Sequence, residues 1–272
     1  LLEGEFVPSE EAGLLSRAQH FQAPVPVLVR FSNFAAVPNL ADGAGAASPR
    51  GMSIKFVLPD GGDTDIVAHS YNGFPAKTGE DFVQFLRAVA APDKGVLAGY
   101  LADHPAAQAF IEAPKPAPAS YASEHYFGVN AFRFTNTAGI GHYGRYSIEP
   151  VAGAAYLSAT EAAERPQNYL TQEMGQRLHS GPVEFRLIVQ IAGAGDDVTD
   201  GSTAWPGDRK RVDAGVVRLT GFAEDSEVVQ RKLLFTPLNL PEGISPSADP
   251  LLVARTRSYR ISFDRRERPA GD

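Results

Sequence analysis

The sequence predicts an α+β fold in which eight antiparallel strands close into one barrel with flanking helices. Eight segments alternate apolar and polar residues, or carry β-branched and aromatic runs between Gly, Pro and Asp, which is typical of half-buried strands. The turn at residues 136–139 joins two of these segments over a short loop, which favours a hairpin. Helical patterns interrupt the strands. The expected strands are residues 3–7, 24–33, 51–58, 65–70, 129–136, 142–149, 183–192 and 211–222.

Four helices are expected around the barrel. Residues 78–91 begin with Thr78 and an acid three positions later, which is the spacing of a capping box. Further helices are expected at about 97–112 and 159–178, with a stiff proline-rich connector at residues 113–118. The last helix, at about 249–268, begins with an N-cap acid followed by proline at the first helical position.

Composition sets the broad class of the protein. The 272 residues suit a single domain, with 43% hydrophobic and 21% charged residues as in soluble globular proteins. A net charge of -7 argues against a nucleic-acid surface, and the lack of cysteine excludes disulfides, thiolate metal ligands and Cys nucleophiles. The sequence has no long apolar run, so no membrane span is expected. We expect a cytoplasmic protein, or a periplasmic or secreted one if a leader has been removed.

Arg255 and Tyr259 form the first candidate chemical pair. They are four residues apart on the last expected helix and therefore share one face. A neighbouring guanidinium favours the negatively charged phenolate form of a tyrosine, as does coordination to ferric iron. An exposed helix pair with no chemical role has the same spacing, so the surrounding motifs decide between the two interpretations.

The segment before that helix contains Phe235, Pro237, Asn239, Gly243, Ile244 and Ser247, followed by Asp249. With Arg255 and Tyr259 it resembles the haem-ligand region of the catalase family, whose pattern is F-x-P-x-N-x-x-x-G-I-x-x-S, an acid, and then R-x-x-x-Y. The resemblance implies haem b as cofactor, Tyr259 as the iron ligand and Arg255 as its charge partner. We expect the barrel wall to enclose this haem.

Two further segments resemble the same family. Residues 29–32 and 49–56 match its V-R-F-S and P-R-G-x-A-x-K-F signatures, which implies that Arg30 pairs with a haem propionate and that Ser32 serves the distal side. Residues 65–70 resemble D-L-V-G-N-N, with His69 at the position of the family's distal asparagine. His69 is therefore a candidate to donate to peroxide or to take its proton, with Asn72 as a nearby substitute.

The resemblance extends from about residue 3 to residue 266 and implies three more contacts with the cofactor. Phe74 and Phe82 fall where the family packs phenylalanines around the haem pocket, and Arg266 falls where it places another arginine near the propionates. The short length is similar to the small, minimal-barrel branch of catalase-related peroxidases. The family's distal histidine motif, H-A-K-G, does not occur, and the expected place for it lies upstream of Leu1. We interpret His20 as part of a surface loop rather than as a replacement.

The leading functional hypothesis is a haem-dependent peroxidase with catalase-like activity, which decomposes hydrogen peroxide in oxidative-stress defence. Small organic peroxides or reductants are its expected partners, and a homodimer is left open. The alternative is a haem-binding or sensing protein with little turnover, because the distal H-A-K-G histidine does not occur in these 272 residues. A barrel that holds another small apolar molecule, and rearrangement of lipid hydroperoxides, are weaker alternatives.

Overall fold

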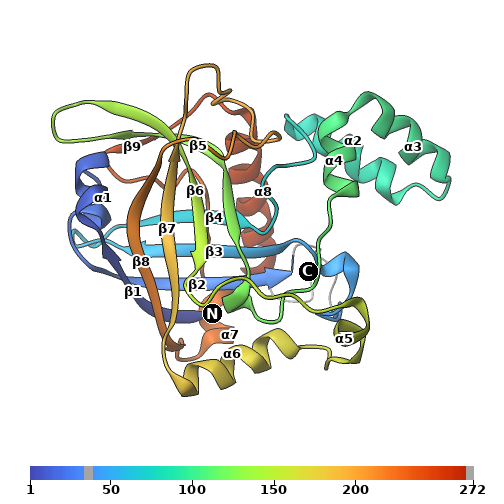
Figure 1. Ribbon diagram of the computed structural model, residues 1–272, viewed down its shortest axis with the longest axis horizontal. Helices are drawn as coiled ribbons and strands as arrows, with labels where there is room; N and C mark the ends of the chain where they lie inside the picture. Colours follow the sequence, from blue (N-terminus) through green and yellow to red (C-terminus); the bar gives the residue numbers. More distant parts are fainter. Residues whose placement is uncertain (34–38, 268–272) are drawn as a thin grey trace.

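All eight expected strands are present and form one antiparallel sheet that closes into a barrel (Figure 1). The computed structural model describes residues 1–33 and 39–267. The strands follow one another around the barrel in the order β4-β3-β2-β1-β8-β7-β6-β5, and the pair His69–Phe127 joins β4 to β5. Their bounds are β1 Leu2–Pro8, β2 Val25–Asn33, β3 Arg50–Val57, β4 Asp63–His69, β5 Tyr126–Thr135, β6 Gly141–Pro150, β7 Val183–Ile191 and β8 Arg211–Phe222.

A ninth short strand, β9 (Ile244–Pro246), pairs with β5 and was not expected from the sequence. The expected hairpin at residues 136–139 is confirmed, since β5 and β6 pair directly on either side of it. No described helix is both long and apolar enough to cross a membrane.

Two of the four expected helices are each divided by a proline. The helix expected at 97–112 is α3 (Lys94–Asp103) followed by α4 (Pro105–Glu112), because the residue before a proline is forced out of helical geometry. The helix expected at 159–178 divides in the same way near Pro166. The remaining α-helices are α1 Glu10–Leu15, α2 Gly79–Ala90, α5 Ala159–Glu164, α6 Tyr169–Ser180, α7 Ser226–Arg231 and α8 Pro250–Glu267; short 3-10 helices occupy Gln19–Phe21, Gly45–Ala47 and Tyr121–Ser123.

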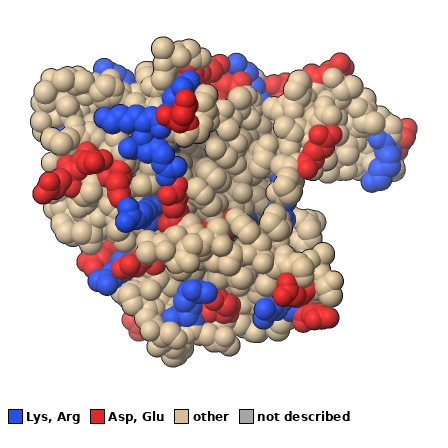
Figure 2. All heavy atoms as spheres, in the orientation of Figure 1, with Lys and Arg blue, Asp and Glu red and all other residues tan. Residues whose placement is uncertain are grey.

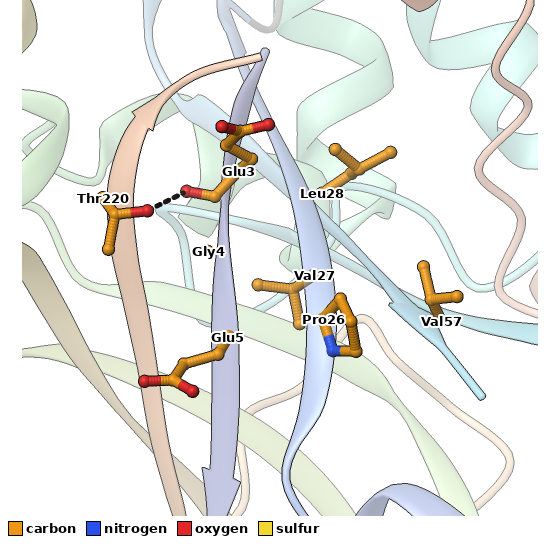
Figure 3. A pocket seen from close by; sticks show the side chains of 8 residues that line it. All are labelled: Glu3, Gly4, Glu5, Pro26, Val27, Leu28, Val57 and Thr220. Atoms are coloured by element: carbon orange, nitrogen blue, oxygen red, sulfur yellow. Dashed lines mark hydrogen bonds between the residues drawn. The ribbon is translucent and has the colours of Figure 1, made fainter. Parts of the chain in front are cut away.

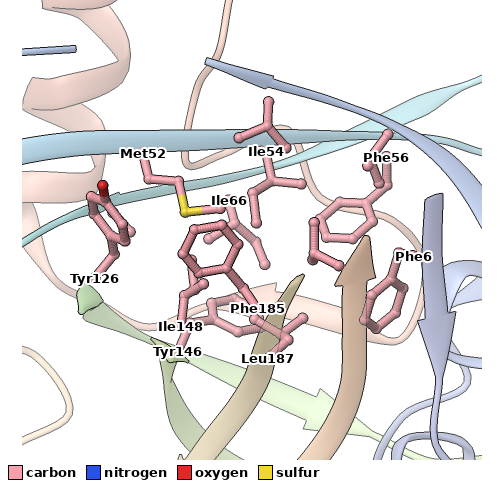
Figure 4. Close-up of a cluster of buried hydrophobic side chains, with 14 of the residues drawn as sticks. Phe6, Met52, Ile54, Phe56, Ile66, Tyr126, Tyr146, Ile148, Phe185 and Leu187 are labelled. Carbon is pink, nitrogen blue, oxygen red and sulfur yellow. The ribbon is translucent and has the colours of Figure 1, made fainter. Parts of the chain in front are cut away.

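The barrel interior is filled with apolar side chains (Figure 4). Alternate residues of β3 show how the wall is built: Met52, Ile54 and Phe56 are fully buried in the core. Each such side chain stabilises the fold by about 1.5–3 kcal/mol through removal of apolar surface from water. The expectation of a haem enclosed by the barrel is therefore wrong, because the space is occupied by close-packed apolar groups.

His20 is also placed differently from the expectation of a surface loop. It lies in the 3-10 helix Gln19–Phe21 and is 1% exposed. Its ring packs against Phe6, Phe21 and Phe56, with centroid distances of 6.2, 4.5 and 4.7 Å. These three rings form an aromatic cage around His20 and explain its burial. Sequence spacing does not reveal such a contact.

The outer face of β2, β3 and β4 is covered by α8 and by the segment at residues 235–240 (Figure 1). The backbone N–H of Thr236 donates to the Asp65 carboxylate at 3.0 Å, and the backbone N–H of Asp65 donates to the carbonyl of Asn239 at 3.1 Å. The helices α2, α3 and α4 project to one side as an arm. Acidic and basic side chains are interspersed on the face shown in Figure 2.

Candidate functional site

Arg255 and Tyr259 are in direct contact on α8. The Nε of Arg255 donates a hydrogen bond of 3.2 Å to the phenol oxygen of Tyr259, and the guanidinium carbon lies 5.7 Å from the centre of the tyrosine ring. A second guanidinium nitrogen of Arg255 donates to the side-chain oxygen of Asn130 on β5. The Arg255 guanidinium is thus held between the phenol oxygen of Tyr259 and the side-chain oxygen of Asn130.

Asn130 and Asp249 extend this contact into a chain of hydrogen bonds. The amide of Asn130 donates to the Asp249 carboxylate at 2.7 Å, and the other carboxylate oxygen accepts the backbone N–H of Leu251 at 2.8 Å. Both residues are 2% exposed. Burial raises the pKa of Asp249, and the hydrogen bond from Asn130 opposes that rise.

Sequence reasoning gave Asn130 no role and assigned Asp249 only the N-cap. The cause is a β-bulge between Gly128 and Phe132, which breaks the alternation of β5 and lets Asn130 face α8 instead of the barrel interior. The only available signal was an amide in an otherwise apolar strand segment, where a buried polar group needs a partner.

Arg30 lies within electrostatic reach of the Tyr259 phenol, and Arg266 lies within electrostatic reach of Arg30. Half-buried Arg30, on the outer face of β2, has its pKa lowered by burial and by the charge of Arg266, while Tyr259 and Asp65 oppose this effect. The guanidinium carbon of Arg30 lies 4.7 Å from the centre of the buried Phe235 ring. Arg266 is exposed, two helical turns beyond Tyr259 on the same face of α8.

Ser32, Gly51 and His69 form a row across β2, β3 and β4. Ser32 pairs with Gly51, and Gly51 pairs with His69. A Cβ atom at Gly51 would lie 2.6 Å from the hydroxyl oxygen of Ser32, so the glycine leaves room between the two polar side chains. Ser32 is exposed, whereas His69 is 5% exposed.

His69 is a neutral imidazole in this environment. Burial, with a contribution from the positive charge of Arg255, lowers its pKa to about 3. Its Nδ1 accepts the backbone N–H of Tyr71 at 3.4 Å, so the neutral ring carries its proton on Nε2. The site therefore presents an N–H donor here, and this histidine is a poor base near neutral pH.

Phe74 and Phe82 pack between the sheet and α8. Their ring centroids are 4.8 Å apart, and the ring of Phe74 lies 6.2 Å from that of His69. Both belong to an apolar cluster with Val129 and Leu251. The two phenylalanines thus close the apolar end of the site beside the histidine.

Asn72 is the predicted site residue that the structure places least favourably. It is exposed in the turn after β4, and no hydrogen bond in the described part of the chain joins it to the other predicted site residues. The remaining eight predicted residues lie on α8, on the outer row of β2 and β4, or in the Phe74–Phe82 cluster.

The chemistry of these residues fits a haem. Tyr259 offers a phenol oxygen that contacts a guanidinium, and tyrosine oxygen is a known ligand of haem iron. Arg30 and Arg266 offer two cations for two propionates, and the open row at Gly51 with the rings of Phe74 and Phe82 suits a flat apolar macrocycle. The group would lie between α8 and the outer face of the barrel.

Comparison with known proteins agrees with this geometry. The catalase family model matches residues 2–268. The chain belongs to the catalase family. A catalase-related peroxidase of Mycolicibacterium paratuberculosis is 37% identical over 270 residues, which cover 96% of this chain and 85% of that protein. A catalase-related peroxidase of Synechococcus elongatus is 30% identical, with 97% and 80% covered, and a Pseudomonas aeruginosa catalase is 26% identical, with 94% and 53% covered.

Solved catalase structures share the fold. A fungal catalase superposes with a TM-score of 0.87 at 22% sequence identity over 98% of this chain, and a bacterial catalase with 0.86 at 19% over the whole chain. The chain spans 58% of the length of each of these two catalases. The shared part is the barrel with its flanking helices, which confirms the expected fold of this family member.

Proposed function

We propose that this protein is a haem-dependent peroxidase with catalase-like activity toward hydrogen peroxide. The observation that carries the proposal is the Arg255–Tyr259 hydrogen bond on the face of α8 that turns toward Arg30. Two relatives at 37% and 30% identity bear the name catalase-related peroxidase and support the assignment. When bound, haem b supplies the redox chemistry of peroxide at its iron.

Each protein group has a defined task in this proposal. Arg255 holds its positively charged guanidinium against the Tyr259 oxygen and fixes the direction of that side chain, while Arg30 and Arg266 bind the propionates. The Nε2–H of His69 donates to a peroxide oxygen and orients it, because the ring stays neutral. Ser32 adds a hydroxyl on the same row. Phe74 and Phe82 exclude water from the distal side.

The test is Tyr259→Phe in protein loaded with haem. Removal of one oxygen atom should abolish tight haem binding and the tyrosinate-type absorption bands, and peroxide consumption should fall to the level of free haem. Tyr143→Phe is the matched control, since Tyr143 is also half-buried but lies on β6. Unchanged pigment content and spectrum in the Tyr259 variant would refute the proposal.

A second candidate function is a haem-binding or sensing protein with little turnover. It is favoured by the surroundings of His69: the side chain is 5% exposed, its Nδ1 accepts the backbone N–H of Tyr71, and burial lowers its pKa to about 3, which makes the imidazole a weak base at neutral pH. The two functions are distinguished by measuring peroxide consumption on the haem-loaded protein expressed from the intact gene. Steady peroxide consumption by that holoprotein supports the peroxidase, whereas a haem spectrum without consumption supports the sensor.

A further inference from the structure

An open groove of about 530 Å³ lies on the outer face of the barrel over β1, β2 and β8 (Figure 3). This volume is within the usual range of small-molecule sites, about 300–1,000 Å³. One side of the groove is apolar and the other carries two carboxylates and a hydroxyl. The groove is lined by Pro26, Val27, Leu28 and Val57, and by Glu3, Gly4, Glu5 and Thr220.

The strand register places this groove directly beside the proposed haem site. Leu28 and Arg30 share the outer face of β2 and are two residues apart, which is about 7 Å along a strand. Glu3 pairs with Leu28, and Glu5 pairs with Pro26. The apolar wall of the groove therefore borders the arginine that is proposed to hold a propionate, and the carboxylates lie on the neighbouring strand.

The carboxylates of Glu3 and Glu5 are available to a ligand. Both side chains are exposed on β1, two residues apart and hence on the same face of the strand. Within residues 1–33 and 39–267, neither carboxylate has a hydrogen-bond or ion-pair partner. Two unpaired negative charges beside an apolar wall favour an aromatic ring that bears a cationic group.

We propose that this groove binds the reducing substrate, and that this substrate is an aromatic amine or phenol with a positively charged side chain. The inference rests on the proposed function. The ring packs on Pro26, Leu28 and Val57 toward the Arg30 edge, and the ammonium lies between Glu3 and Glu5. Each of two such molecules gives up one electron and one proton, and together they reduce one hydrogen peroxide to two waters.

The kinetic test compares two phenols that differ in side-chain charge: tyramine, a cation, and 3-(4-hydroxyphenyl)propionate, an anion. The wild-type holoprotein should oxidise tyramine with the higher kcat/KM. In Glu3→Gln/Glu5→Gln the ratio of the two kcat/KM values should fall about fivefold, mainly through KM for tyramine, as expected for two solvent-exposed charge contacts. Glu80→Gln/Glu112→Gln on the helical arm makes the same change in net charge and should leave the ratio unaltered.

A binding measurement without peroxide separates this proposal from the function itself. Binding of 2-phenylethylamine, which has no oxidisable phenol, is followed by NMR on protein with and without haem. The double glutamine variant should weaken binding about fivefold, and Val57→Trp should abolish it by filling the groove. Binding that persists in haem-free protein supports the groove even if the protein proves not to be a peroxidase.

Two results would overturn the proposal. One is an equal preference for the two phenols that the double variant does not change. The other is 2-phenylethylamine binding that is insensitive to both the double variant and Val57→Trp, with circular dichroism showing that each variant is folded.

Discussion

The guanidinium of Arg255 joins Tyr259 on α8 to Asn130 on β5, donating to the phenol oxygen of one at 3.2 Å and to the amide oxygen of the other. Because Asn130 also donates to Asp249, the direction of the arginine is fixed by the sheet as well as by its own helix. This arrangement makes the proximal side of the candidate site a rigid part of the barrel wall.

Replacement of Arg255 by Gln should loosen the cofactor without unfolding the protein. A hydrogen bond that involves a charged group contributes about 1.5–3 kcal/mol, so its loss should weaken haem retention by about 10- to 150-fold. Haem transfer to apomyoglobin measures this directly. Arg257→Gln, an exposed arginine on the same helix, is the control. Equal transfer rates in the two variants would show that Arg255 does not support the ligand.

Asn130→Ala should destabilise the fold, since it removes the donor to one oxygen of buried Asp249 and the acceptor of one guanidinium nitrogen of Arg255. Two unsatisfied buried polar groups cost about 1–3 kcal/mol each, and we expect a loss of about 3 kcal/mol in the free energy of unfolding. Urea unfolding of the haem-free protein measures it, with Asn72→Ala at an exposed position as the control. A loss below about 0.5 kcal/mol would mean that water replaces the amide.

Lys55→Met should be more damaging than removal of the whole ion pair. The Nζ of Lys55 lies 2.7 Å from the Asp65 carboxylate, and their side chains are 9% and 0% exposed. Burial already raises the pKa of Asp65, and Lys55 opposes that rise. The single variant leaves a buried carboxylate unpaired and should cost about 3–5 kcal/mol. Lys55→Met/Asp65→Leu should recover at least half of that loss in urea unfolding; equal stability of the two variants would contradict the ion-pair account.

His20→Phe should make the protein more resistant to acid. Burial lowers the pKa of His20 to about 3, whereas the unfolded chain takes up this proton near pH ~6.5. The unfolded state thus binds more protons between these two values, so the histidine lowers stability as the pH falls from about 6.5 to about 3, by up to about 1.4 kcal/mol per unit. The loss of stability between pH 7 and pH 5 should therefore be about 2 kcal/mol smaller in His20→Phe.

The same comparison for His142→Phe, at an exposed position, provides the control for the acid experiment. An identical pH dependence in wild type and His20→Phe would show that the unfolded and folded proteins protonate His20 together. His69, whose pKa is also lowered to about 3, contributes a second proton over the same range and remains in both proteins.

Local patterns were sufficient to predict the barrel, because strand alternation depends only on which face of the wall a residue occupies. They were also sufficient for the pairing of Arg255 with Tyr259, which are separated by one helical turn. They failed where the structure departs from a regular period or depends on distant packing. The bulge that turns Asn130 toward α8 and the aromatic cage around His20 are both of this kind.

The filling of the barrel interior was the largest departure from the sequence prediction. A closed barrel suggests a ligand inside it. Eight strands, however, enclose only enough space for their own side chains when residues such as Phe56 and Phe185 point inward. The volume of those inward side chains, which no motif encodes, fills the space that the strands enclose.

The two faces of β3 have different structural roles. Met52, Ile54 and Phe56 pack inside the barrel, while the alternating residues Gly51, Ser53 and Lys55 belong to its outer face. A substitution at Gly51 would meet only the side chain and backbone of Ser32, so it would change the outer surface while the inward residues keep their packing. Lys55 differs from its outward neighbours, because its buried ion pair with Asp65 makes it part of the framework.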